Sequence, residues 1–234
     1  MALLPIFVEV QSRPVLVVGG GEVAQRKVEA LVEAGARVTV ISPRLTPRLA
    51  QLAARGTIRH LARRYQPGDL TGFTLVYGAT DDPGVHRQLA VEARSRGAML
   101  NLADQPHLCD FIVPAVVRRG ELVVAISTGG SSPALASRLR RQFETILGPE
   151  YELLLAIMQE ARKRLHASTE NRLSRMDALN SLAASGLEEP LRRRDFAQAD
   201  RLLVEHLGEN FSLAELGFTA QRLNSYFESS ELAR

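Results

Sequence analysis

The sequence is poor in cysteine and contains no long apolar run. Its 234 residues include one cysteine, Cys109, which excludes an internal disulfide framework and a cysteine-rich metal site. No apolar stretch reaches the roughly 18 residues that a membrane-spanning helix needs. The start MALLPIFVEV has no basic residue and meets Pro5 early, so it does not predict a signal peptide. These absences favour a cytoplasmic protein without a membrane partner.

Charge is distributed unevenly along a chain of ordinary globular composition. Residues 1–150 contain 18 Lys and Arg against 13 Asp and Glu, whereas residues 151–234 contain 11 against 13. The basic excess suits an anionic ligand such as a dinucleotide or a polycarboxylate, and a solvated basic surface explains it equally well. It is weak evidence for nucleic acid as a partner.

The first 130 or so residues alternate short β-rich runs with helical patterns, which is typical of βαβ units and a parallel sheet. The expected strands are 15–18, 38–41, 58–61, 74–80 and 98–104, and the expected helices are 22–35, 47–55 and 82–97. A β-hairpin with its turn at 118–121 follows, and we expect it to carry the sheet outward. A helix over 133–148, capped by Ser132, precedes a region with helical signals only. The fold class is therefore α/β, a Rossmann-like domain followed by a hairpin and an all-helical region.

A glycine-rich turn directly follows the first expected strand. Gly19 to Ala24 fit the pattern G-x-G-x-x-A, in which the first glycine permits a tight turn and Gly21 lets a pyrophosphate approach the backbone. Ala24 is small enough for the helix to pack against the strand. The helix N-terminus at Glu22 and Val23 supplies free N–H donors for an anion. The motif predicts dinucleotide binding, and the alternative is a merely structural tight turn.

One expected feature of NAD sites is missing after the second strand. An Asp or Glu usually binds the ribose hydroxyls there, but this chain has Ser42, Pro43 and Arg44. Ser42 can exchange hydrogen bonds with a ribose, and Arg44 can meet a phosphate or the adenine. We assign these three residues to the cofactor, and the choice between NAD and NADP stays open at this point.

Several separated motifs resemble, in order, the precorrin-2 dehydrogenase part of the siroheme synthases over about residues 3–148. They are LPIFVEV, VVGGGEVAQRKVEALVEAGARVTVISP, GATDD, NLADQP and FIVPAVVRRGELVVAISTGGSSPALA. The resemblance implies oxidation of precorrin-2 to sirohydrochlorin with hydride passing to NAD, and in some members insertion of Fe²⁺ as a further substrate. It also implies a homodimer and three parts: an NAD-binding domain (1–112), a dimerisation segment with a substrate-binding loop (113–148) and a helical region (149–234).

The same resemblance assigns site residues in two motifs after the fourth and fifth strands. Asp104, within N-x-x-D-x-P, matches the catalytic aspartate and is suited to accept a proton as hydride leaves the macrocycle. The alternative is an Asp that caps the turn through its own side chain. Asn101 is assigned to the substrate. By analogy with other doubly wound folds, Thr80 and Asp81 border the nicotinamide ribose. Asp82 is expected to cap the next helix.

The loop STGGSSP is a second candidate anion site. Its glycines and the following helix N-terminus offer backbone donors to a carboxylate-rich tetrapyrrole, and an ordinary helix cap with a solvated basic face is the alternative. The assigned substrate residues are Thr128, Gly129, Gly130, Ser131 and Arg138. Thr128 is included because the loop resembles that of family members.

Two further possibilities are a bound metal and a DNA-binding tail. The five histidines form no H-x-x-x-H pair, and although Asp104 and His107 could meet a transient Fe²⁺, we predict no tightly bound metal. Residues 211–230 faintly suggest a helix-turn-helix, but Arg222 is its only basic residue, which argues against phosphate contacts. Two rival functions remain: a non-catalytic NAD(H)-sensing module, and a chelatase with a vestigial dinucleotide site.

Overall fold

The computed structural model describes residues 3–168 and 172–231. The chain divides into two compact units, Met1–Val113 and Pro114–Arg234, which are described separately. Within the described ranges, no helix combines the length and apolar character required to cross a membrane.

The first unit is built on a five-stranded sheet in which all strands run parallel. Its strands are β1 (Pro14–Val18), β2 (Arg37–Ile41), β3 (Arg59–Leu61), β4 (Leu75–Gly78) and β5 (Met99–Leu102), in the spatial order β3-β2-β1-β4-β5. The register places Val18 opposite both Ile41 and Gly78, and Gly78 opposite Leu102. Four strands therefore end along one line, so the loops that follow them share one edge of the sheet.

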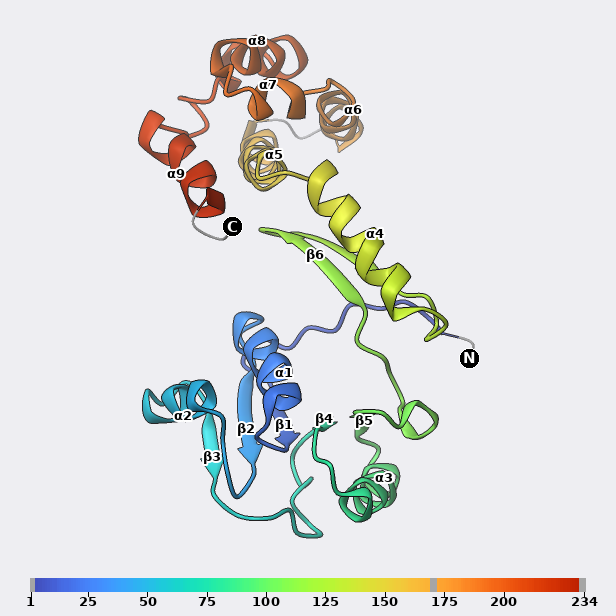
Figure 1. The fold of residues 1–234 in the computed structure, drawn as a ribbon. Coiled ribbons are helices and arrows are strands. Elements are labelled where there is room, and N and C mark those ends of the chain that lie inside the picture. Colours follow the sequence, from blue (N-terminus) through green and yellow to red (C-terminus); the bar gives the residue numbers. More distant parts are fainter. Residues whose placement is uncertain (1–2, 169–171, 232–234) are drawn as a thin grey trace. The chain divides into compact units, whose positions relative to one another are not determined.

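Helices cover the two faces of this sheet (Figure 1). They are α1 (Glu22–Glu33), α2 (Pro47–Ala54) and α3 (Pro83–Arg96), followed by a short 3-10 turn, η1 (Pro106–Leu108). Residues of α1 and α2 share one apolar cluster with one face of the strands, whereas α3 contributes Leu89, Ala90 and Ala93 to the cluster on the other face. This layered parallel sheet confirms the predicted Rossmann-like class.

Start and stop signals in the sequence explain the helix boundaries. Thr46 caps α2 by accepting from Leu49 N, and Asp82 caps α3 by accepting from Gly84 N at 2.8 Å. Each of these two helices has a proline at its start, where a missing N–H costs nothing. Gly97 ends α3 in the left-handed conformation, with φ 67°, as a terminating glycine does.

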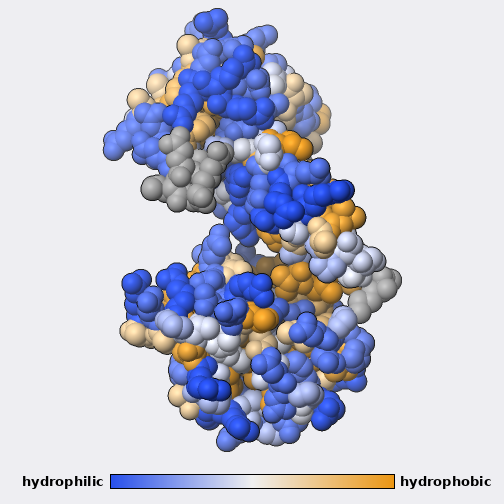
Figure 2. Space-filling model, viewed as in Figure 1, coloured by the Kyte–Doolittle hydropathy of each residue, from blue (hydrophilic) through white to orange (hydrophobic). Residues whose placement is uncertain are grey.

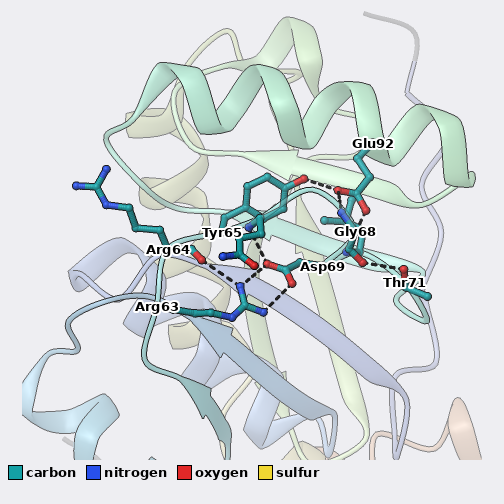
Figure 3. Close-up of polar contacts among 9 residues, drawn as sticks. Arg63, Arg64, Tyr65, Gly68, Asp69, Thr71 and Glu92 are labelled. Carbon is teal, nitrogen blue, oxygen red and sulfur yellow. Dashed lines mark hydrogen bonds and ion pairs between the residues drawn. The ribbon is translucent and has the colours of Figure 1, made fainter.

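The loop between β3 and β4 is tied to α3 through the carboxylate of Glu92 (Figure 3). Glu92 Oε2 accepts from the Tyr65 hydroxyl and from Gly68 N at 3.0 Å, and Oε1 accepts from Leu70 N at 3.3 Å. A bidentate pair between Arg63 and Asp69, with both distances 2.7 Å, closes the same loop. These bonds fix the chain that leads into β4.

The second unit begins with an antiparallel pair, β6 (Ala115–Arg119) and β7 (Leu122–Ile126). This hairpin forms a two-stranded sheet of its own and makes no ladder with the five-stranded sheet. The expectation that it extends the sheet outward was therefore wrong. Alternating apolar residues and a tight turn predict a hairpin, but they carry no information about which strand lies next to it.

Helices make up the rest of the second unit. They are α4 (Pro133–Ile146), α5 (Glu150–Ser168), α6 (Arg172–Ala183), α7 (Glu188–Arg192), α8 (Phe196–Leu207) and α9 (Ala220–Glu231), with a short 3-10 turn, η2 (Glu209–Phe211). An apolar core joins α5 to α9 and includes Leu153, Ile157, Leu203, Phe218 and Phe227. The leucines and phenylalanines of the segment that suggested a helix-turn-helix are buried in this core, as amphipathic packing predicts.

Candidate active site

The glycine-rich turn lies at the edge where the strands of the first unit end. Gly19 follows β1 with φ 126°, a conformation that favours glycine. A Cβ there would lie 2.0 Å from Ala79 O, in the loop after β4. Gly19 thus allows the loops after β1 and β4 to touch, and Gly19 N donates to Ile41 O at 2.9 Å.

The next two glycines have opposite surroundings. A Cβ on Gly20 would lie 2.1 Å from Arg44 O, whereas a Cβ on Gly21 would meet no atom within 4 Å. Gly21 has φ −84°, which any residue can adopt, so neither backbone strain nor packing requires glycine there. The open space above Gly21 suits close approach of a ligand, and the first N–H groups of α1 have no acceptor within the helix. The sequence motif did not single out Gly20, which the loop after β2 requires.

The residues after β2 form a closed loop beside this turn. Ser42 is buried and donates its hydroxyl hydrogen to Arg44 O at 2.7 Å. Thr46 N donates to Gly20 O at 2.9 Å, which ties the loop to the glycine turn. Pro43 and Arg44 are exposed. The predicted ribose contact through Ser42 would use the oxygen lone pairs, because its hydrogen already has an acceptor.

The loop after β4 places Thr80 and Asp81 at the same edge. Thr80 is half-buried and accepts from Asp82 N at 3.4 Å, and Asp81 is exposed. Behind them His86 of α3 is buried, and its Nε2 has no partner among the described residues. Burial lowers the pKa of His86, an effect that the charges of Asp82, Asp104 and Asp81 oppose.

Asp104 follows β5 in a conformation that is rare for a residue with a side chain. Its φ is 59°, in the left-handed region that Asp tolerates better than most residues. The side chain is exposed, and its carboxylate accepts no hydrogen bond from any residue within 3–168 or 172–231. The alternative role as a cap of its own turn therefore has no bond to support it, and the carboxylate is available to a ligand.

A lysine that sequence reasoning did not assign lies beside these residues. Lys27 of α1 donates to Asn101 Oδ1 at 2.8 Å, and its Nζ lies 5.1 Å from the ring centre of Tyr77. Asn101, which is only 7% exposed, donates in turn to Phe111 O at 3.0 Å. Burial lowers the pKa of Lys27; Arg26 adds to this effect, and Cys109 and Asp104 oppose it. The sequence signal that could have identified Lys27 is its position as a charged residue on the apolar face of α1.

The predicted substrate loop lies in the second unit, between β7 and α4. Gly129 and Gly130 have positive φ angles of 61° and 86°, and a Cβ on either would meet nothing within 4 Å. Thr128 Oγ1 accepts from Ser132 N at 3.1 Å, and Ser132 caps α4. Ser131 and Arg138 are exposed. The loop is thus open on the side of its two glycines.

Across the described parts of the chain, no group of three or more His, Cys, Asp or Glu could hold a metal ion.

The fold and the glycine turn define a nucleotide-binding α/β protein of the Rossmann type, and comparisons with known proteins agree. Residues 6–115 match a family described as putative NAD(P)-binding, and residues 119–145 match the family of the sirohaem biosynthesis protein central domain. The solved structure of SirC, precorrin-2 dehydrogenase, superposes with a TM-score of 0.68 at 21% identity, covering 98% of this chain and 99% of that one. That likeness concerns the fold.

Two curated sequence relatives are siroheme synthases. The siroheme synthase of Methylobacillus flagellatus is 50% identical over 163 residues, covering 70% of this chain and 35% of the relative. That of Methylococcus capsulatus is 40% identical over 206 residues, covering 88% and 43%. Over the matched residues, the chain is similar to one part of these siroheme synthases. It spans less than half the length of these curated relatives.

Proposed function

We propose that this chain oxidises precorrin-2 to sirohydrochlorin with NAD as the hydride acceptor, a step in siroheme formation. The similarity to siroheme synthases supports this proposal, and the solved precorrin-2 dehydrogenase has the same fold. The observation that carries the proposal is the free carboxylate of Asp104 at the sheet edge that also holds the glycine turn. An open nucleotide site and an available base at one edge are what such an oxidation needs.

The residues around the glycine turn fit a dinucleotide. The space at Gly21 and the N–H groups at the start of α1 would hold the pyrophosphate, with Glu22 and Val23 supplying donors and Ala24, fully buried, keeping the helix close to the sheet. The loop at 42–44 and Thr80 and Asp81 would border the riboses. When bound, NAD supplies the acceptor for two electrons and one hydrogen of the substrate.

Asp104 would take the second hydrogen as a proton, so that charge and electrons balance. A carboxylate with no internal hydrogen bond needs no rearrangement before it accepts a proton. Asp104 has a left-handed backbone conformation and is exposed, so that a ligand can reach it. In the second unit, the glycines of the 128–131 loop and Arg138 would bind carboxylates of the tetrapyrrole, for which backbone donors and a guanidinium are suited.

We also propose that the chain forms a homodimer through its second unit. Val116 of β6 and three residues of α4 (Leu135, Phe143 and Ile146) expose between 37% and 57% of their surface. In Figure 2, hydrophobic residues lie at the surface beside hydrophilic ones along α4. Large exposed apolar side chains on one hairpin and its helix are typical of an interface. Sedimentation of the wild type and of Phe143→Asp with Ile146→Asp tests this: dissociation to monomers is expected, and an unchanged mass would contradict it.

The decisive experiment is anaerobic turnover of precorrin-2 with NAD and with NADP in parallel reactions. The absorbance of the NADH or NADPH that forms monitors the reaction. Asp104→Asn should lower the rate about a hundredfold or more while leaving NADH affinity and the circular dichroism spectrum unchanged. Asp177→Asn, at an exposed position of α6, is the matched control and should retain full activity. No NADH formation by the wild type would refute the dehydrogenase. Addition of Fe²⁺ to the product then tests for siroheme formation.

A further inference from the structure

Lys27 is a half-buried cation on the apolar face of α1. It lies on the face of α1 that also carries Ala24, Val28 and Leu31, all buried in the apolar cluster. Its Nζ contacts the Asn101 amide oxygen at 2.8 Å and the face of the Tyr77 ring, and it forms no ion pair with a carboxylate in the described parts of the chain. Desolvation of a charged group is costly unless an opposite charge compensates it.

The neighbours hold the ammonium in one place. Tyr77 and Asn101 face each other across β4 and β5, each one residue before its strand ends. Asn101 donates to Phe111 O and accepts from Lys27, so both ends of its amide are engaged and its orientation is defined by the network. An ammonium has three donors. One is donated to Asn101 Oδ1, and the Tyr77 ring adds a cation–π contact, with its centre 5.1 Å from Nζ. At least one N–H therefore remains available to a ligand.

The choice of lysine is informative in this chain. Of its 29 Lys and Arg residues only two are lysines, Lys27 and Lys163, and Lys163 forms an ordinary exposed pair with Glu160 at 2.9 Å. An ammonium is a compact point charge, whereas a guanidinium is a planar fork suited to bidentate contacts. The position therefore suits capture of a single anionic oxygen.

We propose that Lys27 binds an anionic oxygen of the ligand at this sheet edge, with Asn101 as its positioning residue. The oxygen belongs either to a carboxylate of the tetrapyrrole or to a phosphate of the dinucleotide. The identity of these two ligands rests on the proposed function, but the anion site itself does not. Asp104, the proposed base, follows Asn101 by three residues, and its charge acts to raise the pKa of Lys27.

Because the chain has two lysines, selective labelling with ¹³Cε-lysine gives one signal for each, and Lys27→Met assigns them. We expect NADH or sirohydrochlorin, added anaerobically, to shift the Lys27 signal and to raise its pKa, while the Lys163 signal stays unchanged. The ligand that moves the signal identifies the source of the oxygen. Inorganic phosphate and acetate serve as probes of the bare anion site. A Lys27 signal that none of the four additions moves would overturn the proposal.

Affinities give a second, independent readout. Lys27→Met should weaken the ligand that moved the signal about tenfold or more, as loss of a charge-assisted hydrogen bond predicts, and Lys163→Met should change neither dissociation constant. Asn101→Asp should raise the pKa of Lys27 without ligand and weaken the same ligand, because it provides an internal counter-ion. Unchanged affinities in both site variants would refute the assignment. If the proposed function is wrong and the anion site is right, the wild-type protein forms no NADH but the Lys27 signal still shifts on addition of a ligand.

Discussion

Replacing Glu92 with glutamine should destabilise the first unit by about 2 kcal/mol. Each oxygen of this carboxylate accepts from two donors: Oε2 from the Tyr65 hydroxyl and Gly68 N, and Oε1 from Arg96 Nε at 2.8 Å and Leu70 N at 3.3 Å. An amide has only one accepting end. In either orientation, the NH₂ group of glutamine would therefore face two donors.

The geometry indicates which orientation costs less. Arg96 is 39% exposed in its side chain and can turn to water, and Leu70 N makes the longest of the four bonds. The amide should therefore place its NH₂ group on that side and keep the bonds to Tyr65 and Gly68. Hydrogen bonds to a charged acceptor contribute about 1.5–3 kcal/mol each, and the partial rescue of Arg96 by water brings the expected loss to about 2 kcal/mol.

Hydrogen exchange of peptides from β1 and β4 measures this loss within the first unit, which matters because two units can unfold separately. Glu144→Gln is the matched control, since Glu144 pairs with Arg140 on α4 and both side chains are about one third exposed. Its effect should stay below about 0.5 kcal/mol. A loss in Glu92→Gln no larger than that of the control would refute the reasoning.

The same contact predicts how stability depends on pH. Burial raises the pKa of Glu92, but the hydrogen bonds from Tyr65, Gly68, Arg96 and Leu70 outweigh it and the net pKa is lowered. Its stabilisation is therefore complete above the ordinary value of 4.5 and is lost as the pH falls below it. Burial, followed by the bond to Glu92, raises the pKa of Tyr65, so that stabilisation is complete below 10.0 and is lost as the pH rises further. Tyr65→Phe should reduce the loss of stability at alkaline pH, to which Tyr77 also contributes because burial raises its pKa, and should keep most of the loss at acid pH.

Two further predictions concern neighbouring glycines and a buried carboxylate. Gly21→Ala should leave the thermal midpoint within a few degrees but weaken NADH binding at least several-fold. Gly20→Ala should lower the midpoint, because its Cβ would lie 2.1 Å from Arg44 O, whereas a Cβ on Gly21 meets no atom within 4 Å. Equal thermal effects of the two variants in calorimetry would contradict this. Arg192→Met should destabilise the second unit by about 2 kcal/mol, because Glu150 is 2% exposed and loses its partner at 2.9 Å. Urea unfolding, monitored by hydrogen exchange in α5, measures that loss. A loss under about 0.5 kcal/mol would contradict the view that the Arg192–Glu150 ion pair stabilises the second unit.

Much of the fold follows from local signals. The apolar run before Gly19, the caps at Thr46 and Asp82 and the terminating Gly97 depend on neighbouring residues only, and the structure has the expected strands and helices there, with ends that differ by one to a few residues. The hairpin was predicted as a hairpin but attached to the wrong sheet. Its strand alternation fixes which side chains share a face, whereas the partner strand depends on contacts distant in the sequence.

The candidate site shows the same division. The sequence by itself determined the glycine turn and the position of Asp104 after a strand, because strand ends and turn residues are encoded locally. Only the tertiary structure decided that Gly20 packs against the loop after β2 and that Ser42 donates its hydroxyl hydrogen to Arg44 O. It also decided that Lys27 contacts Asn101, 74 residues away. These outcomes depend on the register of parallel strands and on burial, which bring distant side chains together and which no local pattern encodes.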